Sequence, residues 1–465
     1  MRDDSRAELD EAVRRAMALS KELGNIRDTV VTTIYRRAEA IVAETVGQRN
    51  QSKPNWDRRI DDLLTSRLLG YPLMLLLLGL ILWLTIAGAN YPSTVLAALL
   101  FSIEEKLTML FEQLGTPEWV GGILIQGTYR SLAWVVSVML PPMAIFFPLF
   151  TLLEDLGYLP RVAFNLDNLF RRAGAHGKQA LTMAMGFGCN AVGVMAARII
   201  DSPRERMIAI LTNNFMPCNG RFPLLITMSS LFLGVGTVHY GSTLASVIVV
   251  GMVLLGVTTT FVVSFLLSHT LLKGTPTSFA LELPPYRMPQ VLQVIVRSVF
   301  DRTILVLWRA VKVAAPAGAL VWILANVHIG DTNLVNYGAA HLDPFARIIG
   351  LDGFILLAFI LGLPANEIVI PVLLMSYLGA NTLLEFQSLD GLKTLLMSQG
   401  WTWLTALNVM VFSLLHFPCG TTLLTIRSET GSWKWATLAV IITTTAAVIT
   451  CFCITQAVRA MQLIF

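Results

Sequence analysis

The pattern of apolar and polar positions divides the chain into long hydrophobic runs separated by short polar or charged segments. An apolar run of about 20 residues is long enough to cross the hydrocarbon core of a bilayer as a helix, because that core is about 30 Å thick. Runs of this length predict five membrane-spanning helices: Leu68–Ile86, Leu132–Leu153, Leu244–Leu267, Ile304–Val327 and Trp435–Thr455.

Other apolar stretches are interrupted by Gly, Pro, Asn or Cys, and these breaks are informative. They are Ala180–Ile200, Ile208–Leu233, Phe354–Leu378 and Trp403–Ile426. Glycine and proline free backbone amides and carbonyls from the helix, and in lipid each unpaired group costs several kcal/mol. We therefore expect the breaks to line a polar cavity or to contact a substrate.

The composition supports a membrane protein. Hydrophobic residues make up 55% of the 465-residue chain and charged residues only 14%, which is too little polar surface for a soluble globule. We predict an all-α fold, a polytopic membrane helix bundle whose partner is the lipid bilayer. The net charge of +4 is explained by membrane topology and does not indicate a nucleic-acid partner.

The first 65 residues form a different kind of segment. Acids and bases alternate there, with apolar residues at helical spacing, as in Ile34, Ala38, Ile41 and Val42. No apolar core precedes a cleavage site, so we interpret the segment as a small helical region and not as a signal peptide. Basic residues at the amino-terminal end of the first span favour a cytoplasmic location for that end: Arg58, Arg59 and Arg67.

Two parts of the chain match each other at a constant separation of 176 positions. Gly174 pairs with Gly350, Gly177 with Gly353, and the stretch Gly186–Asn190 with Gly362–Asn366. At a separation of 201, Pro217-Cys218 pairs with Pro418-Cys419. Duplicated halves with corresponding broken segments are the best sequence indication of a transporter binding site. The pattern therefore predicts an internal duplication with its site at the breaks.

Three cysteines lie beside these helix breakers: Cys189, Cys218 and Cys419. Thiolate, amide oxygen and freed backbone carbonyl are all metal ligands, and thiolate suits a transition metal such as Fe(II) or Zn(II). The alternative is that each cysteine is a small hydrophobic packing residue. We interpret Cys451 and Cys453, in the last span, as packing or lipid-facing residues. Amides accompany the breaks at Asn190, Asn219 and Asn366.

Ionisable residues add further candidates. Glu367 follows Asn366 in an apolar segment, where a carboxylate needs a partner, a proton or a cation. It either serves the site or pairs with an arginine such as Arg221 or Arg309. Glu154 and Asp155, after the second span, form a cation entrance or mark the water boundary. His416 is a nitrogen ligand or a packing histidine.

The chain contains no phosphate-binding loop of the form G-x-x-x-x-G-K-[ST]. Gly177-Lys178 has the wrong spacing from Gly174, and Gln179 stands where the hydroxyl residue belongs. We therefore expect a transporter and not a nucleotide-hydrolysing enzyme.

Several motifs in order resemble the membrane part of the bacterial ferrous iron transporter family FeoB. They are Gly186-Phe187-Gly188-Cys189-Asn190, Pro203-Arg204-Glu205-Arg206, Pro217-Cys218-Asn219-Gly220-Arg221, Glu282-Leu283-Pro284-Pro285-Tyr286-Arg287 and the stretch from Arg427 to Trp435. The resemblance runs from Ser52 to the carboxyl terminus, and Glu8–Thr45 is similar to the helical segment that follows the family's GTP-binding domain. Two departures lie at the breaks: Ala191-Val192-Gly193 stands where many members have a proline, and Asn219-Gly220-Arg221 where many have Ser-Ala-Arg.

The resemblance implies a multi-pass permease of the bacterial inner membrane with a cytoplasmic amino terminus. Fe(II) would be the transported substrate, with no permanently bound cofactor, and Cys189, Cys218 and Cys419 match the family's proposed metal-relay cysteines. Glu367 matches the acid of the second-half break. The implied partners are a GTP-binding protein, whose domain is either encoded separately or missing, a small accessory cytoplasmic protein and further copies of the chain.

The expected organisation has five parts. A cytoplasmic helical region (1–65) precedes a first transmembrane segment with an amphipathic connection (66–115), a first Gate repeat (116–270), a linker (271–300) and a second Gate repeat (301–465). Two other functions stay open: a nucleoside-like carrier for an organic solute bound by Asn190, Asn366 and Glu367, and a membrane scaffold that transports nothing.

Overall fold

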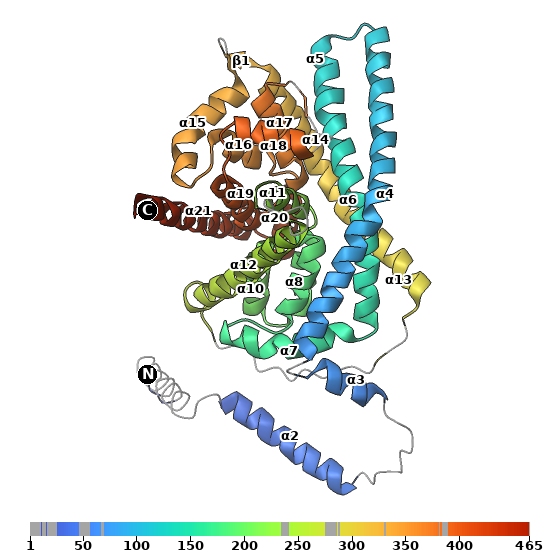
Figure 1. Ribbon diagram of the computed structural model, residues 1–465. Helices are drawn as coiled ribbons and strands as arrows, with labels where there is room; N and C mark the ends of the chain where they lie inside the picture. Colours follow the sequence, from blue (N-terminus) through green and yellow to red (C-terminus); the bar gives the residue numbers. More distant parts are fainter. Residues whose placement is uncertain are drawn as a thin grey trace, which may run out of the picture.

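The fold is an all-α bundle with two short strands, as the computed structural model shows (Figure 1). The structure describes residues 26–45, 56–66, 69–233, 241–274, 289–329, 332–380 and 389–464, together with positions 11, 15, 286, 382 and 383. Several residues used in the sequence analysis lie outside the described part of the chain: most of residues 1–25, Arg67, Leu68, Glu282–Pro285 and Arg287. The side chain of Arg58 also lies outside it.

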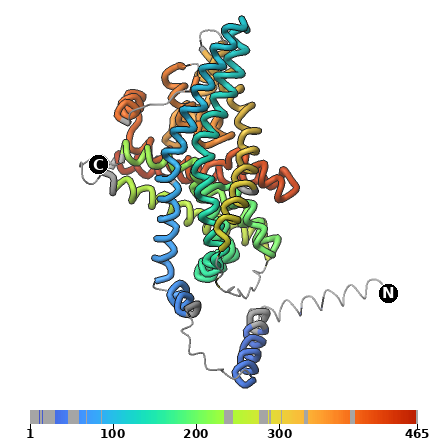
Figure 2. Tube along the Cα trace, turned by 90° about the vertical axis from the view of Figure 1, so that its right-hand side faces the viewer, coloured from blue at the N-terminus to red at the C-terminus, as the bar shows by residue number. Residues whose placement is uncertain are grey.

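The amino-terminal helices lie outside the bundle, beyond the end at which α7 is found (Figures 1 and 2). They are α2 (Ile26–Thr45) and α3 (Trp56–Leu64). Every described side chain of α2 is exposed, including the apolar Ile34, Ile41 and Val42. By contrast, α3 is strongly amphipathic and rests on the start of the next helix.

Two long helices form a hairpin along one side of the bundle (Figure 1). The first is α4 (Gly70–Gln113), and the second consists of α5 (Glu118–Gly121), the π-helical η1 (Gly122–Tyr129) and α6 (Arg130–Asp155). At 1.5 Å per residue the 44 residues of α4 extend about 66 Å, roughly twice the hydrocarbon thickness. The helix therefore continues far beyond the predicted end at Ile86. The part of α4 beyond Ile86 is attached to α6 by an ion pair between Arg130 of α6 and the buried Glu104 of α4, at 3.3 Å.

The first repeat continues through short, broken helices to one long helix. They are α7 (Tyr158–Arg172), α8 (Gln179–Gly188), α9 (Asn190–Ala196), η2 (Ala197–Ile199), α10 (Pro203–Thr212), η3 (Asn213–Phe215), α11 (Phe222–Met228), η4 (Ser229–Leu233) and α12 (Gly241–His269). Ser202 caps α10 through a hydrogen bond from the amide of Glu205, with Pro203 at the first helical position.

The second repeat follows the same plan. Its elements are α13 (Val291–Arg297), η5 (Ser298–Ile304), α14 (Leu305–Asn326), β1 (His328–Ile329), β2 (Thr332–Asn333), α15 (Leu334–Ile348), α16 (Gly353–Leu361), η6 (Asn366–Ile368), α17 (Val369–Leu378), α18 (Leu389–Ser398), α19 (Trp403–Leu415), α20 (Gly420–Thr430) and α21 (Trp433–Ile464). The strands pair antiparallel, with His328 opposite Asn333. Gly318 of α14 lies against the backbone of Gly127 in η1, a close approach that small residues permit.

Six helices in the described part of the chain are long and apolar enough to cross a membrane, judged by length and composition. They contain all five predicted spans, apart from Leu68, Leu69 and Val327, and add the broken stretch Trp403–Thr430. The pair α15 and α16, bent by 111°, counts as a seventh if it is one span. The chain is therefore a multi-pass membrane protein.

The backbone confirms the internal duplication. Gly174 and Gly350 end α7 and α15 with φ of 72° and 74°, a left-handed conformation that glycine adopts without strain. The carboxylates of Asp167 and Asp343 accept hydrogen bonds from the amides of Gly177 and Gly353 at 3.0 and 3.1 Å. All of these pairs are 176 positions apart. The same residues thus build the same loop in front of each broken helix.

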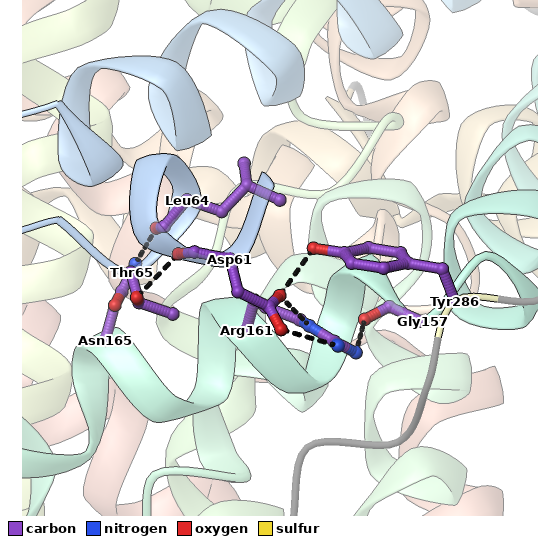
Figure 3. Close-up of polar contacts among 7 residues, drawn as sticks. All are labelled: Asp61, Leu64, Thr65, Gly157, Arg161, Asn165 and Tyr286. Atoms are coloured by element: carbon purple, nitrogen blue, oxygen red, sulfur yellow. Dashed lines mark hydrogen bonds and ion pairs between the residues drawn. The ribbon is translucent and has the colours of Figure 1, made fainter. Parts of the chain in front are cut away.

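A polar clamp joins three segments that are distant in the sequence (Figure 3). Arg161 of α7 is almost fully buried; it donates to Asp61 of α3 at 3.0 and 3.4 Å and to the carbonyl of Gly157 at 2.8 Å. Tyr286, between the repeats, donates to Asp61 at 2.7 Å, and its ring lies 4.2 Å from the guanidinium carbon. The clamp therefore ties the amino-terminal region and the inter-repeat segment to the helix that leads into α8.

The ionisation of the clamp follows from its contacts. Burial raises the pKa of Asp61, but the hydrogen bonds from Arg161 and Tyr286 and the charge of Arg161 outweigh burial and lower this pKa below 3.8. Burial and the hydrogen bond to Asp61 raise the pKa of Tyr286 to about 12. Because the pKa of Asp61 is lower in the folded state than in the unfolded state, ionised Asp61 stabilises the fold. This contribution to stability is complete above the ordinary carboxyl pKa. The contribution is lost as the pH falls through the lowered pKa.

We predict that Asp61→Asn lowers the stability of the protein by about 2–3 kcal/mol, since it leaves the charge of buried Arg161 without a counter-ion. The matched control is Asp62→Asn on the exposed side of the same helix. Thermal unfolding in detergent should show a lower melting temperature for the first variant only. Equal melting temperatures for the two variants would contradict a stabilising clamp.

Candidate functional site

The first break lies between α8 and α9. Cys189 is extended, with φ −156° and ψ 125°, and interrupts the helix between Gly188 and Asn190. Gly188 is in contact with the ring of Phe146, and a Cβ at this position would overlap that ring. The carbonyl of Gly188 accepts a hydrogen bond from the amide of Asn219 at 3.4 Å. The second broken segment of this repeat therefore supplies a donor to the first.

The corresponding break in the second repeat has the same backbone conformation. Ala365, 176 positions after Cys189, has φ −153° and ψ 124°, and Asn366 begins the next helical turn. The amide of Gly420 donates to the carbonyl of Leu363 at 2.7 Å. Each repeat thus joins its two broken segments by a backbone hydrogen bond at the break, which satisfies one of the groups that the interruption frees.

The breaks meet around one small cavity of about 20 Å³. A volume of about 10–15 Å³ is enough for one water molecule, so the cavity has room for one or two waters or a single ion. Seven of the predicted site residues line it: Cys189, Cys218, Cys419, Asn190, Asn219, Asn366 and Glu367. Tertiary folding therefore brings the thiols, the amides and the carboxylate of both repeats to one place.

Glu367 lies at the cavity with its carboxylate directly against Gly220, where a Cβ would collide with it. It forms no ion pair with any described residue. The proposed structural partners are engaged elsewhere, because Arg309 donates to Thr425 at 3.0 Å and Arg221 binds backbone carbonyls. The carboxylate is thus directed to the cavity and not to a salt bridge.

Arg221 is fully buried and caps the end of α19 from the other repeat. Its guanidinium donates to the carbonyl of Leu414 at 2.8 Å and to that of Asn214 at 2.7 Å, with longer contacts to His416 and Phe417 at 3.4 Å. The side chain of Asn214 also donates to the carbonyl of His416 at 2.7 Å. A positive charge is favourable at a helix carboxyl end, so the first repeat satisfies the carbonyls that the second repeat leaves free.

The other predicted site residues lie away from this cavity. His416 is buried among Phe359, Phe412 and Phe417, and its Nδ1 contacts the carbonyl oxygens of Phe412 and Ser413 at 3.0 and 2.9 Å. Glu154 and Asp155 end α6, next to the loop before α7. Of the remaining cysteines, Cys451 is buried and Cys453 is exposed on α21.

The thiols and the carboxylate do not form a ready-made metal centre. Among the described residues, no three His, Cys, Asp or Glu side chains are close enough together to hold a metal ion. The sulfur of Cys419 contacts the hydroxyl of Thr422 at 3.2 Å. The lining thus offers sulfur, amide and carboxylate groups in a narrow space without a complete set of metal ligands.

Sequence reasoning missed several lining residues: Met139, Met143, Gly220, Pro364 and Thr421. The two methionines come from α6, which we interpreted as a plain membrane span. A signal was present, since α6 contains Pro141, Pro142 and Pro148, and prolines inside a membrane helix often accompany a functional cavity.

Comparison with known proteins agrees with this geometry. The Gate family, described as "Nucleoside recognition", matches residues 136–232 and 307–433, one segment in each repeat. A second family, described as "Ferrous iron transport protein B C terminus", matches residues 249–302. No solved structure gives a significant match.

Curated relatives extend the match. The Fe(2+) transporter FeoB of Staphylococcus aureus strain MSSA476 is 28% identical over 445 residues, which cover 94% of this chain and 63% of that protein. The Fe(2+) transporter FeoB of Methanocaldococcus jannaschii is 27% identical over 436 residues, covering 91% and 62%. An Fe(2+) transport protein A/Fe(2+) transporter FeoB fusion protein of Porphyromonas gingivalis strain W83 is 26% identical over 486 residues, covering 91% and 55%.

Paired broken helices around a polar cavity, with a Gate match in each repeat, define a polytopic Gate-type membrane protein. Within that class the chain is similar to the Fe(2+) transporter FeoB and resembles its membrane portion. It spans about 63% of the length of the Staphylococcus aureus relative.

We predict that Arg221→Met lowers stability by about 3 kcal/mol or more, because the buried carbonyls of Asn214 and Leu414 each lose a charged donor. Arg427→Met, at an exposed position near the end of α20, is the control, since Arg427 stacks on Trp433 at the surface. Thermal unfolding in detergent should separate the two variants by several degrees. A melting temperature for Arg221→Met equal to that of the control would show that the cap is not needed.

Proposed function

We propose that this chain transports ferrous iron into the cytoplasm through the cavity at the paired breaks. The observation that carries the proposal is the convergence of three thiols, three amides and one carboxylate, contributed by both repeats, on a space with room for one ion. The names of the relatives, Fe(2+) transporter FeoB, support Fe(II) as the substrate.

The ligand set suits passage of a borderline metal. Sulfur ligands favour Fe(II) over the hard cations Mg²⁺ and Ca²⁺, and amide oxygens bind it more weakly. Since the cavity holds only one or two waters, the ion must lose part of its hydration shell to enter. Cys189, Cys218 and Cys419 would replace that shell in part, and Glu367 would balance the positive charge. A mixed and incomplete set releases the ion, whereas a closed four-sulfur site would retain it.

A separately encoded GTP-binding protein would control the passage from the cytoplasmic side. The proposal places its docking site on residues 1–65, where α2 presents an exposed surface and α3 is attached through Asp61 to α7. A fusion of transport protein A to FeoB in Porphyromonas gingivalis supports a small accessory protein as a second partner. We also propose the bacterial inner membrane as the location, with the amino terminus in the cytoplasm.

Replacing all three cavity cysteines by serine should lower Fe(II) uptake at least tenfold, because hydroxyl groups do not supply the sulfur ligation that a transition metal prefers. The control is Cys453→Ser, a thiol exposed on α21 and outside the cavity. Uptake of radioactive ferrous iron into proteoliposomes under reducing conditions measures both. Wild-type uptake by the triple variant would exclude a cysteine relay.

The carboxylate of Glu367 gives an independent test. Gly220→Ala places a methyl group where the carboxylate lies, so we expect uptake to fall several-fold, with a similar loss for Glu367→Gln. Gly251→Ala, in a membrane helix with open space around the new methyl group, should leave uptake unchanged. The role of Glu367 is refuted if Glu367→Gln transports Fe(II) as fast as the wild type.

One alternative has a specific observation in its favour. The printed description of the Gate family, "Nucleoside recognition", favours a carrier for an organic solute held by Asn190, Asn366 and Glu367, for which the cavity of about 20 Å³ would have to widen. The same proteoliposomes distinguish the two functions, because a nucleoside carrier would take up labelled nucleoside and be indifferent to the cysteine substitutions. A scaffold would transport neither substrate.

A further inference from the structure

A second, larger cavity of about 260 Å³ lies between the hairpin and the first repeat. Its walls come from α4, α7, α8 and α12, and its lining is almost entirely apolar. Along α8 the lining positions Ala180, Met183, Ala184 and Phe187 follow helical spacing, so one face of this helix forms the back wall. In Figure 1, α7 lies at the lower ends of α4 and α8, and it contributes its own apolar face.

The mouth of the cavity opens toward the bilayer. Leu75 of α4 and Leu254 of α12 line it and are 68% and 58% exposed. Both belong to helices that are apolar and long enough to span the membrane, and whose outer faces are little buried. The mouth is therefore continuous with the surface that contacts lipid hydrocarbon.

The deep end of the cavity is protein core. Met216 is 0% exposed, and Met183 and Phe187 are also buried. Protein interiors are close-packed, and an engineered apolar cavity of about 150 Å³ stays free of water and binds benzene. This larger cavity has no described side chain that fills it, and water is excluded by its lining. The apolar ligand available in a membrane is a lipid chain.

We propose that this cavity binds one acyl chain of a bilayer phospholipid. The chain enters between Leu75 and Leu254 and ends against Phe187 and Met216. These two residues directly precede Gly188-Cys189 and Pro217-Cys218, the breaks of the first repeat. The bound chain thus packs against the outer side of the wall that carries two of the cavity cysteines.

The test uses a phospholipid with a photoreactive diazirine near the end of one acyl chain, reconstituted with the full chain into proteoliposomes. After illumination, peptide mass spectrometry locates the adducts. We expect adducts on Met183, Phe187 or Met216, which are shielded from bulk lipid unless a chain enters the cavity. Adducts restricted to exposed residues of α4, α12 or α21, or no adducts at all, would overturn the proposal.

A pair of variants on α12 provides the control. Val257→Trp fills the cavity and should reduce the deep adducts at least fivefold, whereas Val262→Trp, on the exposed lipid side, should leave them unchanged. Ala184→Leu, a smaller filling on α8, replaces Val257→Trp if that variant does not fold. Deep adducts that persist at the wild-type level in the folded filling variant would refute the site. The adducts are located without measuring iron uptake. The result for this cavity is therefore independent of the result for the proposed function.

Discussion

The structure depends on one constraint: backbone groups that leave a helix inside a membrane must find partners there. Four broken segments free such groups, and the protein satisfies them between segments and between repeats. Asn219 donates to Gly188 and Gly420 donates to Leu363, while Arg221 of the first repeat caps α19 of the second. Each repeat thus bonds its own two broken segments together, and the first repeat also caps a helix end of the second. The polar cavity therefore lies where the two repeats meet.

The two repeats share a backbone but differ in chemistry. Cys189 and Ala365 have nearly identical dihedral angles, and the loops before them use the same Asp and Gly pairs. At this break the first repeat supplies sulfur, and the second supplies the charge of Glu367, opposite Ala191 in the first. Duplication thus preserved the geometry of the interruption and left its side chains free to diverge. The cavity therefore has a pseudo-symmetric frame and an asymmetric lining.

Two features of the first repeat lie near the polar cavity. On one side, Arg161 links α3 and the inter-repeat segment to α7, which leads through Gly174 into the first broken helix. On the other, an apolar cavity reaches the residues that precede Cys189 and Cys218. The first repeat is therefore attached to the amino-terminal region and adjacent to lipid, whereas the second forms most of the largest hydrophobic core.

The sequence by itself determined the membrane class, five of the spans, the duplication and seven of the residues that line the cavity, because apolar length, period and helix breakers are local properties. Only the tertiary structure decided that these residues share one cavity, that Glu367 faces Gly220 and not an arginine, and that His416 packs among phenyl rings. The tertiary structure also set the full length of α4 and placed the methionines of α6 in the lining of the cavity. These outcomes depend on contacts between segments up to about two hundred residues apart, which no local pattern encodes.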